Sequence, residues 1–151
     1  MKTTCGIFLI NKHKQILICH PTNEHPQKWN IPKGIKDSCE TDLNAAWREV
    51  TEETGIHRDD VIRRGHRFKR AMLGEAFYQE KPKRIVAYAY IFDGELDNEL
   101  VCDSTFYCTY EKRRLPEVDR FRWLHYEHAA KYLNSSQQEL LVNAIKLGLF
   151  K

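Results

Sequence analysis

Hydrophobic residues in the first twenty positions form two short runs with a polar turn between them. The first run ends in Ile-Phe-Leu-Ile at residues 7–10, the second covers residues 15–19, and Asn-Lys-His-Lys separates them. Short apolar runs bounded by polar residues are typical of buried strands. The pattern therefore predicts a β-hairpin over residues 4–19.

Residues 42–54 follow the spacing of an amphipathic helix. The apolar positions recur at i, i+3, i+4 and i+7 and are Leu43, Ala46, Trp47 and Val50. Thr41 is a suitable N-cap, and Gly55 stands where a left-handed C-cap is expected. We expect a helix from about residue 42 to residue 54 that packs its apolar stripe on the core.

The second half of the chain predicts further strands. Residues 63–70 are basic and carry little apolar periodicity, whereas residues 85–92 have the composition of a central strand. A turn at residues 93–95 is expected to end that strand. Residues 121–124 predict one more strand.

Two helices are expected at the C-terminal end, over residues 127–133 and 136–147. Ser135 or Ser136 would cap the second. Strands, one helix, more strands and terminal helices fit an α/β (α+β) chain with a mixed sheet between helices. The length of 151 residues is near the modal domain size, so we expect a single domain over residues 1–151.

Composition narrows the class of protein. No apolar run approaches the roughly 18 residues that a membrane span needs, and the first residues lead into a strand, so a cytoplasmic location is expected. The net charge of +3 does not by itself argue for nucleic acid. The five cysteines lack metal-site spacing and are expected to be reduced thiols. A monomer and a homodimer are both compatible with the sequence.

Three glutamates lie on the polar side of the predicted helix. Glu49, Glu52 and Glu53 stand at i, i+3 and i+4, so they share one face. Their repulsion near the negative end of the helix dipole is unfavourable unless a cation relieves it, and Arg48 alone cannot neutralise three carboxylates. Because Mg²⁺ binds carboxylates together with substrate phosphates, this face is expected to hold a divalent cation, Mg²⁺ or Mn²⁺.

The segment from Gly34 to Ile56 has the spacing G-x5-E-x7-R-E-V-x-E-E-x-G-I. It resembles the signature box of the Nudix hydrolases at every fixed position. The preceding Trp-Asn-Ile-Pro-Lys-Gly at residues 29–34 resembles the approach to the box in many of these enzymes. The resemblance implies a Nudix-type α/β/α sandwich with a mixed β-sheet. It also implies metal-dependent hydrolysis of a phosphoanhydride bond in a nucleoside diphosphate linked to another moiety.

The resemblance assigns a role to each fixed residue of the box. Glu49 and Glu53 would be metal ligands, and Glu52 would be a further ligand or the base that activates a water molecule. Glu40 and Arg48 are expected to brace the box. The two fixed glycines, expected to serve backbone conformation, are Gly34 and Gly55.

Many Nudix enzymes add a carboxylate from outside the box as a ligand or general base. The candidates are Glu95, Asp97, Glu99, Glu111, Glu117 and Asp119. We expect Glu117 to be both a metal ligand and a catalytic group. Residues 116–123 resemble a segment before the last strand of dinucleoside polyphosphate hydrolases and bacterial RNA 5′-pyrophosphohydrolases. An ordinary loop charge is the alternative role of Glu117.

Lys33 supplies the best indication of substrate. A lysine before the box glycine resembles asymmetric dinucleoside tetraphosphate hydrolases, in which it lies near the polyphosphate. Dinucleoside polyphosphates, such as diadenosine tetra- or triphosphate, are therefore the expected substrates, with Arg84 and Tyr78 as further binding residues. Two downstream substrate markers are missing. Ala71 and Met72 stand where ADP-ribose hydrolases often carry proline. Dinucleoside polyphosphate enzymes carry a tyrosine a residue or two further on, but the nearest tyrosine here is Tyr78.

Other substrates and a non-enzymatic role stay open. ADP-ribose or FAD is one alternative, and an RNA 5′ end is another, because Lys-Pro-Lys-Arg at residues 81–84 somewhat resembles the RNA pyrophosphohydrolases. A Nudix-like nucleotide-binding module is the non-enzymatic alternative, which the complete set of glutamates disfavours. No DNA or membrane partner is expected.

Basic residues cluster in the expected loops and strand edges, where they would steer an anionic substrate. They are Arg63, Arg64, Arg67, Lys69, Arg70, Lys81, Lys83, Arg84, Lys112, Arg113 and Arg114.

Overall fold

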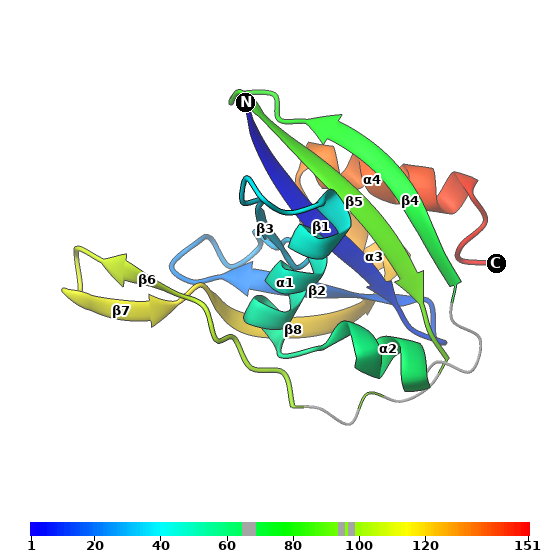
Figure 1. Cartoon of the computed structure of the whole chain (residues 1–151), viewed down its shortest axis with the longest axis horizontal. Coiled ribbons are helices and arrows are strands. Elements are labelled where there is room, and N and C mark those ends of the chain that lie inside the picture. Colours follow the sequence, from blue (N-terminus) through cyan, green and yellow to red (C-terminus); the bar gives the residue numbers. More distant parts are fainter. Residues whose placement is uncertain (65–68, 94–95, 97–98) are drawn as a thin grey trace.

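The computed structural model describes residues 1–64, 69–93, 96 and 99–151. Its main sheet has the strand order β4-β5-β1-β2-β8, with a short strand β3 paired to β1 (Figure 1). The strands are β1 (Lys2–Ile10), β2 (Gln15–Pro21), β3 (Lys33–Ile35), β4 (Lys69–Phe77), β5 (Lys83–Ile91) and β8 (Val118–His125). β1 and β5 are parallel, and the other pairs are antiparallel. The sheet is therefore mixed, as expected.

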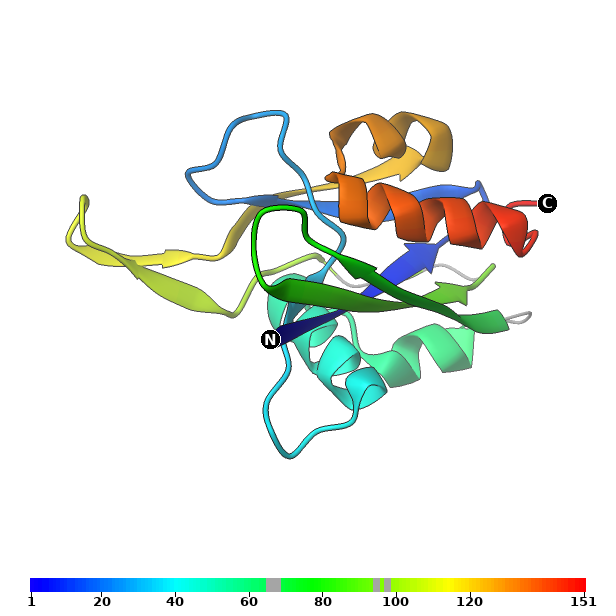
Figure 2. The same cartoon turned by 90° about the horizontal axis from the view of Figure 1, so that it is seen from above.

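Helices cover both faces of this sheet (Figure 2). One face carries α1 (Asp42–Thr54) and α2 (Arg58–Arg64), and the other carries α3 (Tyr126–Ala129), a 3₁₀ turn η1 (Ala130–Tyr132) and α4 (Ser135–Lys146). Each face has its own buried cluster. Alternate residues of β1 divide between them, since Ile7 and Leu9 pack on the α1 side while Phe8 and Ile10 pack on the α4 side.

The sheet opens between β1 and β2. These strands pair only at Ile10 and Ile16, after which they diverge. The segment before and within β3 enters the gap: the N–H of Ile7 donates to the carbonyl of Pro32 at 3.2 Å. Asn30 forms a bridge with Cys19 on the other side. This divergence creates the space in which the candidate site lies.

A separate hairpin projects from the body of the molecule (Figures 1 and 2). It consists of β6 (Thr105–Cys108) and β7 (Arg113–Pro116), and it leads directly into β8. The sequence pattern did not predict this hairpin. It also did not predict α2 or β4, since β4 is an edge strand whose residues are largely exposed.

The central helix is confirmed at both ends. Thr41 accepts a hydrogen bond from the Asn44 N–H at 3.1 Å, and Gly55 ends the helix with φ of 80°. The expected cap of the last helix was wrong. Asn134, rather than Ser135 or Ser136, accepts the N–H of Gln137 at 3.0 Å, because an asparagine side chain one position earlier already satisfies the first turn.

Three other expectations are modified. The two N-terminal strands are antiparallel neighbours but share only one register pair. The helix expected over 127–133 is a single α-turn followed by 3₁₀ structure. The turn expected at 93–95 and the basic stretch at 63–70 lie partly outside the described residues. No helix in the described part of the chain is long and apolar enough to cross a membrane.

Candidate active site

Helix α1 buries two of its glutamates at the opening in the sheet. Glu49 is 8 % exposed and Glu53 is 4 % exposed, whereas the Glu52 side chain is 42 % exposed. The helix is anchored by its apolar stripe, with Ala46, Trp47 and Val50 buried against the sheet. Two carboxylates are therefore held out of water by the packing of the opposite side of the same helix.

Gly34 makes room for Glu49. A Cβ at position 34 would lie 2.0 Å from the carboxyl carbon of Glu49. Gly34 is not among the described glycines with positive φ, which are Gly55, Gly74 and Gly148. Gly55 thus has a left-handed backbone conformation, whereas Gly34 leaves space for the Glu49 carboxylate.

Arg48 joins the helix to the loop before it. Its guanidinium donates to Glu40 through Nε at 2.7 Å and through Nη2 at 2.9 Å, and Nη2 also donates to the carbonyl of Ile35 at 3.0 Å. The Arg48 side chain, together with the N–H of Asp37, holds the pKa of Glu40 at about 2. This two-point contact joins helix α1 to the loop between β3 and α1, and the bond to the Ile35 carbonyl joins it to the end of β3.

The same guanidinium contacts two of the candidate metal ligands. Arg48 Nη1 donates to Glu49 at 2.9 Å and approaches both oxygens of Glu52 at 3.3 Å. One cationic group thus stands between the two carboxylates. It relieves the repulsion that the sequence pattern implied.

Glu53 is the most buried carboxylate of the site. It accepts the backbone N–H of Lys33 at 3.0 Å. Burial raises its pKa to about 7, the positive charge of Lys33 opposes that rise, and the nearby negative charges of Glu49 and Glu117 add to it. Burial also raises the pKa of Glu49. Such elevated pKa values suit a carboxylate that exchanges protons near neutral pH.

A pocket of about 340 Å³ opens beside these groups. Glu53, Lys33 and Glu117 line it together, and Cys19 and Phe106 of the β6–β7 hairpin also line it. The structure thus brings together one residue from α1, one from β3 and one from the β7–β8 junction. These three are among the site residues expected from the sequence.

Backbone contacts position Glu117. Its N–H donates to the carbonyl of Ser104 and its carbonyl accepts the N–H of Thr22, each at 3.0 Å. The other outside candidates that the structure describes have different surroundings. Asp119 lies 2.7 Å from His20 Nδ1, Glu111 pairs with Arg113, and Glu99 is exposed. Glu95 and Asp97, like Arg67 of the basic clusters, lie outside the described residues.

Arg84 and Tyr78, expected to bind substrate, do not line this pocket. Arg84 donates to Glu75 at 2.7 Å and to Thr3 at 3.0 Å. Tyr78 packs against the core on the α4 side, with the ammonium of Lys83 4.9 Å from its ring centroid. The geometry therefore gives no support to a role for either residue in this pocket.

Asn30 lines the pocket and was missed by the sequence analysis. Its backbone is fully paired with Cys19. Its side-chain oxygen accepts a hydrogen bond from Gln137 Nε2 at 3.1 Å, and Gln137 Oε1 accepts the N–H of Ile31 at 2.9 Å. Because a backbone N–H can only donate, the Ile31 N–H must face the side-chain oxygen of Gln137. The Gln137 N–H₂ therefore faces Asn30, and the Asn30 atom that it contacts is the side-chain oxygen. None of the hydrogen bonds among the described residues uses the Asn30 amide N–H₂, so it is available to a ligand in the pocket that Asn30 lines.

The donor chemistry of the site fits a hard divalent cation. Glu49 lies within electrostatic reach of Glu52, Glu53 and Glu117, and Glu53 also lies within reach of Glu117. Within the ranges that the structure covers, no three acidic, histidine or cysteine side chains converge closely enough to hold a metal ion.

Comparison with known proteins places this geometry in a family. A model of the NUDIX domain matches residues 2–143. The chain belongs to the NUDIX family. The family assignment expected from the box at residues 34–56 is thereby confirmed.

Several relatives and solved structures resemble this NUDIX protein. An RNA pyrophosphohydrolase of Aliivibrio fischeri is 27 % identical over 149 residues, covering 93 % of this chain and 81 % of the relative. One of Vibrio vulnificus is 28 % identical, covering 93 % and 80 %. A C. elegans Ap4A hydrolase structure has a TM-score of 0.66 at 18 % identity, covering 99 % of this chain and 98 % of that one. The structural match confirms the expected fold.

Proposed function

We propose that this NUDIX protein is a metal-dependent hydrolase that cleaves a phosphoanhydride bond in a nucleoside diphosphate linked to another moiety. The observation that carries the proposal is the pocket that Lys33, Glu53 and Glu117 line together. It combines a cation for phosphate with the carboxylates of Glu53 and Glu117, and burial raises the pKa of Glu53. The family match and the names of the relatives support the reaction class.

Glu49, Glu52, Glu53 and Glu117 are the proposed ligands of Mg²⁺ or Mn²⁺. The ion would polarise the bridging phosphate, lower the pKa of a bound water and stabilise charge on the leaving oxygens. Before an ion binds, the pKa of about 7 lets the Glu53 side chain exchange a proton within the pocket at neutral pH. Lys33 and the Asn30 amide would orient the phosphates, and Arg48 with Glu40 would hold the box in place.

Dinucleoside polyphosphates, such as diadenosine tetra- or triphosphate, are the first candidate substrates. The position of Lys33 in the pocket and the resemblance of the fold to Ap4A hydrolase structures support them. The 5′ end of RNA is the second candidate, supported by curated relatives named RNA pyrophosphohydrolase. ADP-ribose and FAD have no supporting residue in the described pocket.

Product analysis by chromatography tests the proposal. Diadenosine tetraphosphate, diadenosine triphosphate, ADP-ribose, FAD and 5′-triphosphorylated RNA would each be incubated with Mg²⁺ and then Mn²⁺. We expect turnover of dinucleoside polyphosphates that is lost in Glu53→Gln and Glu52→Gln, while circular dichroism shows both variants folded. Absence of metal-dependent turnover of every nucleotide would contradict the proposal and favour a nucleotide-binding module.

A further inference from the structure

Three lysines project from one face of the sheet near its N-terminal edge. Lys2 of β1 is the register partner of Lys83 in β5, and Lys33 of β3 is the partner of Gly6 in β1. Register partners point to the same side of a sheet, and so do residues two or four positions apart in one strand. Lys2, Lys33 and Lys83 therefore share a face. Gly6 provides the room, because a Cβ there would lie 2.7 Å from the Lys33 Cβ.

Lys28 and Lys81 complete a group of five, which we name the lysine patch: Lys2, Lys28, Lys33, Lys81 and Lys83. Figures 1 and 2 both place the N-terminus beside the β4–β5 turn that carries Lys81. Partial burial lowers the pKa of Lys83, and the positive charges of the other four lysines lower it further. The other four ammonium groups thus act on that of Lys83 although they come from separate segments.

Acidic residues leave most of the lysine patch uncompensated. Among the residues that the structure describes, only Lys28 of the five has an ion pair, a 3.5 Å contact with Glu24 in which both side chains are about half exposed. Arg84, next to Lys83, is different, since Glu75 holds it at 2.7 Å. Concentrated like charge with few acidic partners disfavours the folded state, and an anionic ligand would relieve that repulsion.

The lysine patch is continuous with the pocket. Lys33 lines the pocket beside Glu53, while Lys2 and Lys81 are exposed at the outer end of the same face. The pocket volume of about 340 Å³ is near the small end of the usual range for ligand pockets. A ligand with a long phosphate-bearing chain would therefore continue from the pocket onto the patch.

We infer that the lysine patch binds the backbone phosphates of a single-stranded RNA whose phosphorylated 5′ end lies in the pocket. Lysine binds phosphate as a point charge without reading the base, so the contact would be independent of sequence. The inference rests on the proposed function, because it takes the pocket as the site of the 5′ end. A dinucleoside polyphosphate shares the phosphate chemistry but offers a much shorter chain.

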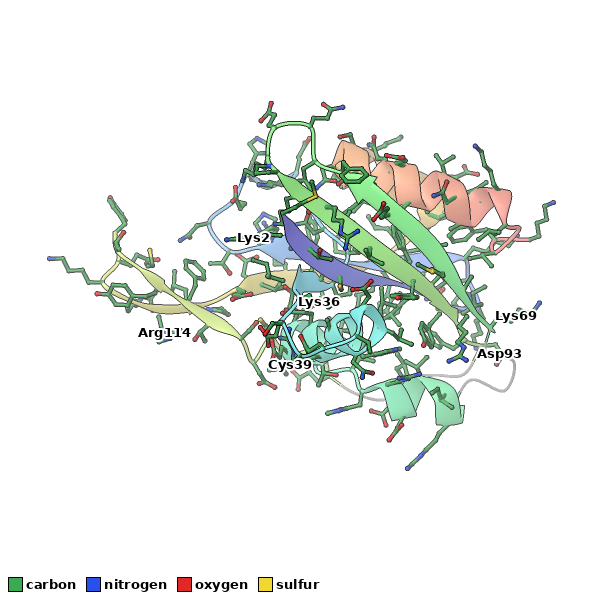
Figure 3. The ribbon with its side chains drawn as sticks, turned by 45° about the horizontal axis from the view of Figure 1, so that its top comes forward. Lys2, Lys36, Cys39, Lys69, Asp93 and Arg114 are labelled. Carbon is green, nitrogen blue, oxygen red and sulfur yellow. The ribbon has the colours of Figure 1, made fainter. Side chains whose placement is uncertain are left out.

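The test measures how salt weakens RNA binding. Fluorescence anisotropy of a 3′-labelled, 5′-triphosphorylated eight-nucleotide RNA would be followed from 50 to 200 mM salt without divalent metal. The triple variant Lys2→Gln, Lys81→Gln, Lys83→Gln would be compared with Lys69→Gln, Lys146→Gln, Lys151→Gln, which removes the same charge. Lys69 is a suitable control because Figure 3 labels it at the opposite end of the sheet from Lys2.

We expect the patch variant to reduce the slope of log affinity against log salt by about 2, since each single-strand phosphate contact contributes about 0.7. Wild type would then lose about twentyfold more affinity than the variant over this salt range. The control variant would keep the wild-type slope, and Lys83→Arg would keep it as well. If the triple variant does not fold, the double variant at Lys2 and Lys81, both exposed, would lower the slope by about 1.4.

Equal slopes for the patch and control variants would overturn the inference. An unchanged RNA slope with a raised KM for diadenosine tetraphosphate would also overturn it, because the patch would then serve the short polyphosphate. The proposed function fails separately, through loss of all metal-dependent turnover. In that case a reduced slope in the patch variant would support the contact between the lysine patch and RNA phosphates, and it would no longer support a 5′ end in the pocket.

Discussion

The Glu49 carboxylate occupies the space next to Gly34 that any other side chain at position 34 would fill. A Cβ on Gly34 would lie 2.0 Å from both the carboxyl carbon and Oε2 of Glu49. Glu49 is 8 % exposed, so it has little room to withdraw. The glycine that opens the box and the first glutamate of its acidic face therefore specify each other through packing.

Gly34→Ala is expected to displace the Glu49 carboxylate and to reduce turnover by roughly a hundredfold, the effect of about 1 Å of misplacement in a catalytic group. Overpacking would also destabilise the fold by about 1–3 kcal/mol. Steady-state kinetics and urea unfolding would measure the two effects. Ile35→Ala, next in the chain and 47 % exposed, is the control. Wild-type kcat in Gly34→Ala would show that Glu49 needs no fixed position.

Arg48→Lys is expected to lower metal affinity and turnover by roughly ten- to hundredfold, because residues that orient metal ligands have effects of this size. Lysine keeps the charge but cannot make the two-point contact with Glu40 at 2.7 and 2.9 Å. Titration with Mn²⁺ followed by electron paramagnetic resonance would report affinity without turnover. Glu40→Gln should show a similar loss. Wild-type affinity in both variants would exclude a bracing role for this pair.

The metal-free protein is expected to lose stability as pH rises through 7. Burial raises the pKa of Glu53 from its ordinary 4.5 to about 7, so between these values the native state binds more protons than the unfolded chain. The stability linked to Glu53 is thus complete below pH 4.5 and is lost as pH passes 7. A difference of about 2.5 pKa units corresponds to about 3 kcal/mol at most.

Glu53→Gln removes this titration. In chelator, urea unfolding should find the variant more stable than wild type at about pH 8, and the advantage should shrink towards pH 4.5. Glu139→Gln, an exposed position on α4, is the matched control. An advantage that does not change with pH would mean that Glu53 does not titrate in this range.

Gln137→Glu is expected to reverse the orientation of the Asn30 side-chain amide without substituting any residue that lines the pocket. Once the carboxyl at position 137 is ionised, both of its oxygens would accept, so Asn30 would turn its N–H₂ towards position 137 and its oxygen towards the pocket. The substrate would then lose one hydrogen-bond donor. A hydrogen bond to a charged group contributes about 1.5–3 kcal/mol, so KM should rise roughly ten- to hundredfold with kcat little changed.

Asn30→Asp tests the same relationship from the pocket side and should raise KM in the same direction. Gln137→Met, which removes the hydrogen bonds to Asn30 and Ile31 without adding charge, separates loss of the fixed orientation from its reversal. A KM unchanged in Gln137→Glu, with the variant folded by circular dichroism, would mean that the Asn30 amide does not contact the substrate.

Local signals determined most of the central helix. Its apolar spacing, the cap at Thr41 and the left-handed Gly55 act within a few residues of one another, so the sequence indicates both ends correctly. The acidic face was predictable for the same reason, because helical geometry alone places Glu49 and Glu53 together. Edge strand β4 and the β6–β7 hairpin were not predictable, since exposed strands lack a buried periodic pattern.

Only the tertiary structure decided what surrounds those glutamates. The sequence identified Lys33 and Glu117 through family resemblance, and long-range pairing brings both to the same pocket as Glu53. The role of Asn30 depends on Gln137, which is 107 positions away in the chain. Helix periodicity and capping depend on neighbours in sequence. A pocket wall depends on which distant segments the sheet brings together, and the strand order of the sheet is set by long-range pairing.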